Sequence, residues 1–400
     1  MIVGFDASRA FVNKKTGTEN YSYQLLKALA KIDRKNKYIV YLRPKSLDSA
    51  IAHFNDNFSF KEISWSRLWT QGGLALETFK EKLDVLFVPS HTLPVIRKPG
   101  LKTVVTVHDL GSEYLPSLHQ VKQRIYLSFM QKHQLKTATK IIAVSKATKL
   151  DLVNKIGIEE KKIEVVYEGY DQKLFKPVTN DLLINSLRQY QLEPKKYFLF
   201  VGTVQPRKNL ERLIKAFARF LEIRGEKWEL DTLKSRSLDF KKSKHQYQKY
   251  PISHFKNFSL IIAGSKGWLS DEIYELPKKL GIEGRVKFLG YVPDKDLPAL
   301  YSGAKAFLFP SLFEGFGLPI IEAQACGAPV LTSSISSMSE VAGDTAILVD
   351  PYDIDSIRNG IIKIMDQEVA KELTKKGFEN IKRFSWEKCA KETLKVFSSL

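Results

Sequence analysis

The sequence contains two series of short, continuous runs of apolar residues, and segments with helical spacing of apolar residues lie between the runs. The runs are rich in Val, Ile, Leu and Phe and lie at residues 2–5, 38–42, 85–88, 103–107, 141–144 and 163–166, and then at 197–201, 260–263, 286–289, 306–309, 330–331 and 347–349. Such continuous apolar character is typical of strands that are buried on both faces of a parallel sheet. The pattern therefore predicts an α/β chain with two doubly wound, Rossmann-like sheets in tandem.

The length of 400 residues also favours two domains, because single domains usually span about 100–200 residues. We expect a first domain over 1–180 and a second domain over 190–378, with a polar stretch between them. Residues 224–257 interrupt the second series and are interpreted as a basic insertion, and residues 379–400 as a terminal amphipathic helix. A ligand is expected in the cleft between the two sheets, at the carboxyl ends of the strands.

Composition argues against several classes of protein. The apolar runs are far shorter than the ~20 residues that cross a bilayer, and the first residues lack the basic region of a signal peptide. Two cysteines, Cys326 and Cys389, cannot form a disulfide framework, and no group of Cys and His has the spacing of a zinc site. We expect a cytoplasmic protein without a metal or a cofactor.

The chain is strongly basic. It has 63 Lys and Arg against 44 Asp and Glu, a net charge of +19, and residues 1–180 carry 29 against 17, a net +12. This excess favours an anionic partner, which could be nucleic acid, a membrane surface or a phosphorylated substrate; a solvated basic surface is the alternative.

The segment that carries the most chemistry is Phe-Glu-Gly-Phe-Gly-Leu-Pro-Ile-Ile-Glu-Ala at 313–323, directly after a predicted strand. Pro319 favours the first turn of a helix that Gly327 can end, so the amides of Gly315–Leu318 belong to a helix N-terminus, which favours a phosphate. Glu314 in the loop and Glu322 one turn into the helix can both reach the cleft, where carboxylates favour sugar and ribose hydroxyls. The alternative is a capping loop with a solvent-facing glutamate.

A second segment, Gly-Thr-Val-Gln-Pro-Arg-Lys-Asn at 202–209, follows another predicted strand. Arg207 and Lys208 precede a helix for which Asn209 is a favourable N-cap. Adjacent cations beside free helix amides favour a diphosphate. An ordinary basic loop is the alternative.

Three weaker signals lie at other predicted strand ends. His108 ends the strand at 103–107 and is interpreted either as a hydrogen-bonding group of the cleft or as a structural histidine. Gly17 lies in the first loop, where a single glycine is a weak phosphate-loop signal, and Ser145 and Lys146 end another strand. Two Asp-x-Asp triplets, at 294–296 and 353–355, each open a helical pattern and are interpreted as helix caps rather than metal ligands.

Together these segments are recognisable. The Glu314-x7-Glu322 motif, followed by Ala-Cys-Gly-Ala-Pro-Val, resembles the group 1 glycosyltransferases (family GT4), which are retaining enzymes of the GT-B fold. Further matching segments are Thr-Gly-Thr-Glu-Asn-Tyr at 16–21, Thr-Val-His-Asp-Leu at 106–110, Ala-Val-Ser-Lys at 143–146, Val-Gly-Thr at 201–203, Pro-Arg-Lys-Asn at 206–209 and Phe-Leu-Gly-Tyr-Val at 288–292.

The resemblance implies two Rossmann-like domains that face a cleft, with the terminal helix around Trp386 crossing back to the first domain. It also implies the site. Arg207 and Lys208 would neutralise the diphosphate of the donor, Glu322 would bind its ribose and Glu314 would contact the transferred sugar.

The remaining site residues follow from the same resemblance. His108 would contact the sugar near the reacting carbon, so that the implied catalytic residues are His108, Glu314, Arg207 and Lys208. The implied donor-binding residues are Gly17, Gly202, Arg207, Lys208, Tyr291, Val292, Gly315, Phe316, Gly317, Leu318 and Glu322, and the resemblance implies that Gly290–Val292 borders the base. No position in these motifs is clearly that of a covalent nucleophile, which favours front-face substitution.

The particular residues of the motifs are similar to those of bacterial mannosyltransferases of polysaccharide assembly. This resemblance makes GDP-mannose the expected donor and a glycan or lipid-linked saccharide the expected acceptor. Another donor, such as UDP-glucose or a dTDP-deoxyhexose, stays open, and so does a nucleotide-sugar epimerase of the same fold. A nucleic-acid-binding protein is a further alternative, although no DNA- or RNA-reading motif is present. The basic first domain, with apolar residues at 121, 125 and 129 among cations, favours peripheral contact with an anionic membrane at the inner face of the plasma membrane.

Overall fold

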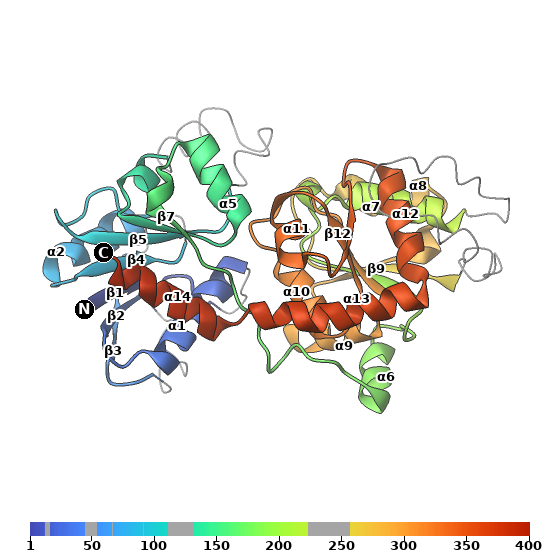
Figure 1. The fold of residues 1–400 in the computed structure, drawn as a ribbon, viewed down its shortest axis with the longest axis horizontal. Coiled ribbons are helices and arrows are strands. Elements are labelled where there is room, and N and C mark those ends of the chain that lie inside the picture. Colours follow the sequence, from blue (N-terminus) through green and yellow to red (C-terminus); the bar gives the residue numbers. More distant parts are fainter. Residues whose placement is uncertain (13–16, 45–53, 66, 91, 111–131, 223–256) are drawn as a thin grey trace.

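The computed structural model describes residues 1–12, 17–44, 54–65, 67–90, 92–110, 132–222 and 257–400. The chain forms two lobes, each built around one parallel sheet (Figure 1). The first sheet has the order β3-β2-β1-β4-β5-β6-β7 and the second the order β10-β9-β8-β11-β12-β13. Both orders reverse once, between β1 and β4 and between β8 and β11, which is the doubly wound arrangement predicted from the sequence.

The strands agree closely with the apolar runs. In the first sheet they are β1 (Ile2–Asp6), β2 (Lys37–Leu42), β3 (Phe58–Glu62), β4 (Val85–Val88), β5 (Lys102–Val107), β6 (Lys140–Ala143) and β7 (Ile163–Val165). In the second they are β8 (Tyr197–Val201), β9 (Ser259–Ala263), β10 (Val286–Gly290), β11 (Ala306–Phe309), β12 (Val330–Ser333) and β13 (Ile347–Val349). Only β3, at the edge of its sheet, was not predicted.

Helices cover both sheets. Those of the first domain are α1 (Gly17–Ile32), the π-helix η2 (Trp69–Leu74), α2 (Ala75–Lys80), α5 (Lys146–Asp151), the π-helix η4 (Leu152–Ile156) and the 3₁₀ turn η5 (Glu160–Lys162). Those of the second part are α6 (Asn180–Arg188), α7 (Leu210–Leu221), α8 (Asp271–Lys279), α9 (Leu297–Gly303), α10 (Leu318–Ala325), α11 (Ser336–Ala342), α12 (Ile354–Met365), α13 (Gln367–Asn380) and α14 (Trp386–Ser398). Its 3₁₀ turns are η6 (Pro206–Lys208), η11 (Glu283–Arg285), η12 (Asp294–Asp296) and η13 (Ile381–Arg383).

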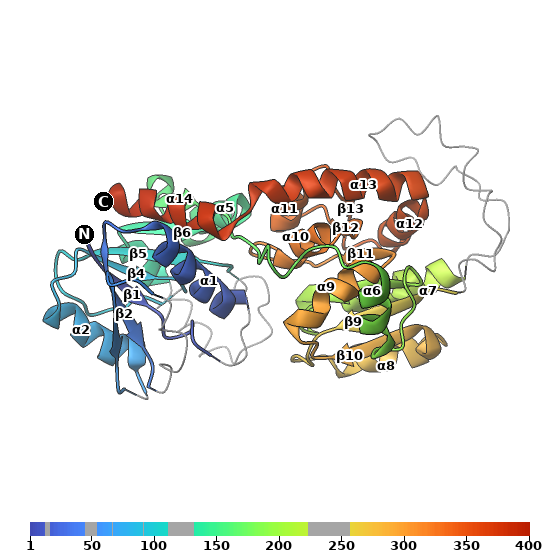
Figure 2. The same ribbon diagram turned by 90° about the horizontal axis from the view of Figure 1, so that it is seen from below.

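The last helix crosses back to the first domain, as the resemblance implied. Figure 2 shows α13 and α14 in succession across the two lobes, and α14 packs on α1. The Trp386 ring lies 5.8 Å from that of Tyr21, and the Phe397 ring 5.3 Å from that of Phe87. A β-carbon at Gly169 would lie 2.1 Å from the Trp386 nitrogen, so a glycine is required where the outgoing and returning segments cross.

The expected domain boundaries stay a prediction. Helix α6 packs on α9, and its Leu187 is fully buried. The expected insertion lies outside the described residues except for Asn257.

Within the described part of the chain, every helix is too short or too polar to cross a bilayer.

Candidate active site

The cations predicted to bind a diphosphate lie between the two halves of the second sheet, in the turn η6 that follows β8. Their partner is Glu314, which lies after β11 on the other side of the switch point. Arg207 Nη1 lies 2.9 Å from Glu314 Oε2, and Lys208 Nζ lies 2.6 Å from Glu314 Oε1. Three of the four predicted catalytic residues therefore form one charged cluster.

This cluster is deeply buried, since Lys208 and Glu314 are each only 7% exposed. Burial by itself raises the pKa of Glu314, but the charges of Lys208 and Arg207 outweigh it and hold that pKa below its usual value. Burial also lowers the pKa of Lys208, although Glu314 opposes this effect. Glu314 thus serves here as the counter-ion of both cations.

The Glu314 loop, residues 310–317, is held by hydroxyl groups that donate to its carbonyl oxygens. Ser336 and Ser337, at the start of α11, donate to the Glu314 carbonyl at 2.9 and 2.8 Å, and Ser337 also reaches the Phe316 carbonyl. Ser145, from the first domain, donates to the Gly315 carbonyl at 2.7 Å. Gly317 has a φ of 105°, which favours glycine, and α10 starts directly after it with Pro319 in its first turn as predicted.

The first domain touches this loop closely. A β-carbon at Gly315 would lie 1.8 Å from the carbonyl oxygen of His108, so any larger residue would push the two domains apart. The Phe316 side chain is buried, with its ring 6.1 Å from Tyr167 and 5.6 Å from Phe384. Phe316 and Gly315 can therefore offer a donor their backbone rather than their side chains.

A carboxylate also links the domains. Glu340, on α11, accepts hydrogen bonds from the backbone N–H groups of Lys146 at 2.8 Å and Ala147 at 3.2 Å, which form the first turn of α5. An acceptor at a helix N-terminus satisfies amides that have no partner inside the helix. Glu340 thus fixes α5, and with it Ser145, against the second domain.

His108 lies at the carboxyl end of β5, but its ring is engaged within the first domain. Its Nδ1 lies 3.0 Å from Glu168 Oε1, and its Nε2 lies 2.9 Å from the Pro89 carbonyl oxygen. Both partners can accept a hydrogen bond, which favours the protonated ring. Burial by itself lowers the pKa of His108, but Glu168, the Pro89 carbonyl and Asp109 together outweigh burial, so the pKa lies above its usual value. The contact of His108 with a sugar stays a prediction.

Glu322 lies in α10, one turn after the Glu314 loop, as predicted. Tyr301 donates a hydrogen bond of 3.2 Å to Glu322 Oε2. Burial raises the pKa of Glu322 to about 8, and the charge of Asp294 adds to this effect. Tyr291 is 59% exposed and Val292 is buried in the segment expected to border the base.

The remaining predicted positions are two glycines and one cap. Gly17 opens α1, where a β-carbon would have no atom within 4 Å, and Gly202 has a φ of 148° beside the Lys208 side chain. The prediction that the Asn209 side chain caps the following helix was wrong. Asn209 does precede α7, but with a φ of 60° its amide donates to the carbonyls of Pro310 and Pro351, so it ties the Glu314 loop in place.

The prediction that both Asp-x-Asp triplets cap helices is confirmed for 353–355 but not for 294–296. Asp353 caps α12 by accepting from the Asp355 nitrogen, whereas Asp296 precedes α9 without a capping bond and accepts from the Tyr190 hydroxyl instead. Among the described residues, no group of three His, Cys, Asp or Glu could hold a metal ion.

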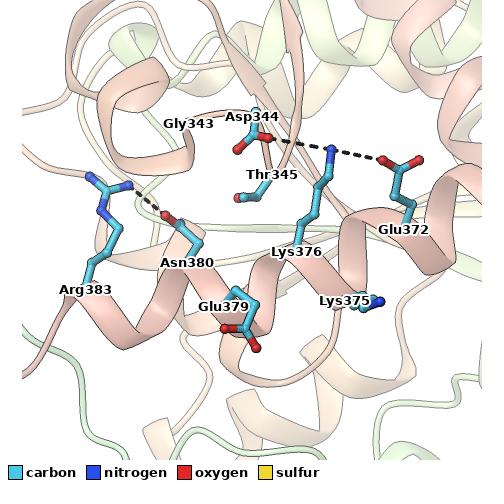
Figure 3. A pocket seen from close by; sticks show the side chains of 9 residues that line it. All are labelled: Gly343, Asp344, Thr345, Glu372, Lys375, Lys376, Glu379, Asn380 and Arg383. Carbon is cyan, nitrogen blue, oxygen red and sulfur yellow. Dashed lines mark hydrogen bonds and ion pairs between the residues drawn. The ribbon is translucent and has the colours of Figure 1, made fainter.

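A separate pocket of ≈ 550 Å³ lies beside α13, at the 343–345 loop (Figure 3). Several of its polar groups are engaged with one another: Lys376 bridges Glu372 at 2.9 Å and Asp344 at 3.6 Å, and Arg383 donates to Asn380. It contains none of the predicted site residues, and we assign no ligand to it.

Two tandem Rossmann-like sheets and a helix that crosses back to the first domain define the GT-B fold, which is a fold of glycosyltransferases. Two family models match the chain, "Glycosyltransferase Family 4" over residues 15–174 and "Glycosyl transferases group 1" over residues 185–384. The chain belongs to this family of retaining glycosyltransferases.

Relatives and solved structures agree with this assignment. The chain is 30% identical over 300 residues to O-antigen chain mannosyltransferase B of Escherichia coli, which covers 75% of this chain and 71% of the relative. It is 27% identical over 274 residues to O-antigen chain mannosyltransferase RfbU of Salmonella typhimurium, covering 68% and 63%. Its fold matches sucrose-phosphate synthase from Thermosynechococcus elongatus with a TM-score of 0.72 at 20% identity over 100% of this chain and 98% of that chain.

Several residues of the site escaped the sequence analysis. These residues form hydrogen bonds with backbone groups or with other site residues, and none belongs to a motif that we singled out. They are Ser336, Ser337, Glu340, Glu168 and Tyr301. Position alone could have suggested Glu168, because it follows β7 at the same sheet edge as His108.

Proposed function

We propose that the enzyme transfers mannose from GDP-mannose, with retention, to a glycan or lipid-linked saccharide acceptor in the synthesis of a cell-surface polysaccharide. The observation that carries the proposal is the cation pair of Arg207, which is partly buried, and Lys208, which is buried, at a switch point, with Glu322 one helix turn from the Glu314 loop. The names of the relatives, which are O-antigen mannosyltransferases, support the sugar and the pathway.

In the proposed reaction the bond between the sugar C1 and the diphosphate oxygen breaks, and the diphosphate keeps the electron pair. The acceptor oxygen bonds to C1 from the same face and passes its proton to the departing phosphate oxygen. Arg207 and Lys208 stabilise the charge that develops on the diphosphate, and because they are already fixed by neighbouring groups, little reorganisation is needed.

A carboxylate beside the segment expected to border the base would favour guanine. Asp294 follows the segment expected to border the base, and its charge acts on Glu322. Guanine presents two donors, N1–H and the N2 amino group, to a carboxylate, whereas uracil presents one donor between two acceptors. We therefore expect Asp294→Asn to weaken binding of GDP more than binding of UDP.

The test is a donor panel. Binding of GDP-, UDP-, dTDP- and ADP-sugars is measured by calorimetry, and transfer from GDP-mannose is followed with retention read from the anomeric configuration of the product. If UDP-glucose or a dTDP-deoxyhexose binds more tightly than GDP-mannose, the assignment of GDP-mannose as the donor is wrong. Turnover of the donor without an acceptor would indicate an epimerase. Salt-sensitive binding to unrelated duplexes would favour a nucleic-acid-binding protein, which we do not expect.

We further propose that the enzyme acts in the cytoplasm, with its first domain in peripheral contact with the inner face of the plasma membrane. The net charge of +12 over residues 1–180 supports this placement. The apolar and basic residues at 121–129 that first suggested it lie outside the described residues.

A further inference from the structure

The outward face of one helix in the first domain is apolar. η2 and α2 run on from each other over residues 69–80, and one side of this helix is buried through Trp69, Leu74 and Thr78. A surface helix normally presents polar residues on its other side. Here Leu76 and Phe79 are 46% and 49% exposed, and Leu68, just before the helix, is 70% exposed.

A second segment with exposed apolar residues runs beside this helix. Gln71 bonds the Leu93 carbonyl at 3.0 Å and the Val95 nitrogen at 2.9 Å, and the Lys98 nitrogen donates to Thr78 at 3.0 Å. Between these anchors, Ile96 is 70% exposed. The α2 patch is defined as the exposed apolar residues of these two segments together with Trp65, whose ring lies over Gly72 and Gly73 of the helix. Its six residues are Trp65, Leu68, Leu76, Phe79, Val95 and Ile96.

The charges around the α2 patch favour an anionic partner. Residues 65–102 contain six Lys and Arg against three carboxylates, Glu77, Glu81 and Asp84. All three carboxylates are engaged, since Lys61 pairs with Glu77 at 2.6 Å and with Glu81 at 2.7 Å, and Asp84 accepts from a backbone nitrogen.

The form of the patch favours a bilayer over a protein. It is carried by the outer side of a helix and an adjoining loop, at the end of the first domain that is remote from the second domain (Figure 1). Apolar side chains among an excess of cations are typical of a surface that inserts shallowly between anionic headgroups.

We propose that the α2 patch docks the enzyme on an anionic lipid surface, with Leu76, Phe79 and Ile96 inserted and neighbouring lysines on the headgroups. The proposal rests on the membrane contact proposed above and names the surface that would make it, from which a lipid-linked acceptor would be approached. Binding itself needs neither donor nor acceptor.

The experiment is co-sedimentation of the full chain with phosphatidylcholine vesicles, with and without phosphatidylglycerol, at low and high salt. We expect binding to the anionic vesicles that weakens at high salt. The double variants Leu76→Gln/Phe79→Gln and Lys82→Gln/Lys98→Gln should each reduce the bound fraction at least about fivefold. The matched control is Leu182→Gln/Ile184→Gln, two exposed apolar residues of α6 that should leave binding unchanged.

Thermal unfolding and GDP binding of each variant show that it is folded. The proposal is overturned if the wild-type protein ignores anionic vesicles, if both patch variants bind as it does, or if the control loses binding equally. A patch variant that changes the sedimentation coefficient of the protein without vesicles would assign the patch to a contact between copies and also overturn it. Vesicle binding without transfer from any donor would refute the proposed function and leave the docking surface standing.

Discussion

Replacing Glu314 by glutamine tests the charged cluster most directly. Glu314→Gln keeps the size of the side chain but removes the charge that neutralises Lys208, whose Nζ lies 2.6 Å away. Lys208 is 7% exposed, so water cannot take over the lost interaction. The variant should therefore be less stable than the wild-type protein in the absence of a ligand.

The size of the effect follows from the burial of the pair. Breaking a buried ion pair by removing one partner costs about 3–5 kcal/mol. Lys208 can limit this cost by losing its proton. Deprotonating a lysine with the usual pKa of 10.5 at pH 7 spans about 3.5 pH units, which costs about 4.8 kcal/mol at about 1.36 kcal/mol per unit. At about 2–4 °C per kcal/mol for a domain of this size, the Tm should fall by about 6–20 °C.

The sign of the pH dependence is fixed by the same residue. In Glu314→Gln the pKa of Lys208 in the folded state lies further below its unfolded value, so the unfolded state binds more protons. The difference in stability from the wild-type protein should therefore shrink as the pH rises from 7 towards 10.

A diphosphate should rescue the variant, because it supplies the missing negative charge. In the wild-type protein the donor must share Arg207 and Lys208 with Glu314, so GDP should bind Glu314→Gln about tenfold or more tightly, while transfer falls. A glutamate that contacted only the transferred sugar would instead leave the affinity for GDP unchanged.

The assay is thermal unfolding with and without GDP, with affinity measured by calorimetry. The control is Glu211→Gln, which breaks an exposed pair with Lys215 and should change stability by less than about 1 kcal/mol. A Tm within about 2 °C of the wild-type value, or weaker binding of GDP, would show that Glu314 is not the counter-ion of the cation pair.

Four further outcomes follow from the site. Because the pKa of Glu322 is raised to about 8, its carboxyl group holds a proton at lower pH, and this proton must be released when the carboxylate binds the ribose. The affinity for GDP, measured by calorimetry, should therefore rise by up to about tenfold per pH unit from about pH 6 to pH 8. The Glu322→Gln variant should not show this rise. Glu340→Gln should raise the KM for the donor about two- to fivefold in initial-rate assays, because α5 loses a charged cap, and an unchanged KM would refute the link. Gly315→Ala should reduce transfer at least about tenfold while calorimetry still detects GDP binding, because its β-carbon would meet a backbone oxygen of the first domain. Transfer should survive EDTA, since Arg207 and Lys208 supply the positive charge, and a loss restored by Mg²⁺ would contradict this.

The fold could be predicted from the sequence because its strands are central. A strand buried on both faces must be apolar throughout, and such runs at 85–88 and 306–309 match β4 and β11 residue for residue. β3 has the sequence Phe-Ser-Phe-Lys-Glu and two exposed residues among its five, because it is an edge strand. Its alternating pattern over so few residues resembles a loop.

The charged residues of the cluster could be selected from the sequence as candidates, but their pairing could not be predicted. Arg207 and Glu314 are 107 positions apart, and only the folded sheet shows that they form an ion pair without a ligand. The hydroxyl contacts of Ser145, Ser336 and Ser337 leave no signal in the sequence, because their partners are backbone carbonyls that every residue possesses. Asn209 was misassigned because its positive φ removes it from the usual geometry of an N-cap.

The arrangement couples binding of the donor to the contact between the domains. The Glu314 carboxylate faces cations of the second domain, while the next carbonyl, that of Gly315, accepts from Ser145 of the first domain. If a diphosphate displaces the carboxylate and the backbone of residues 314–315 moves with it, we expect the hydrogen bond between the domains to change as well. When the diphosphate leaves, Glu314 can return to the cation pair and compete with the product. We therefore expect the same carboxylate to oppose tight binding of the nucleotide and to favour its release.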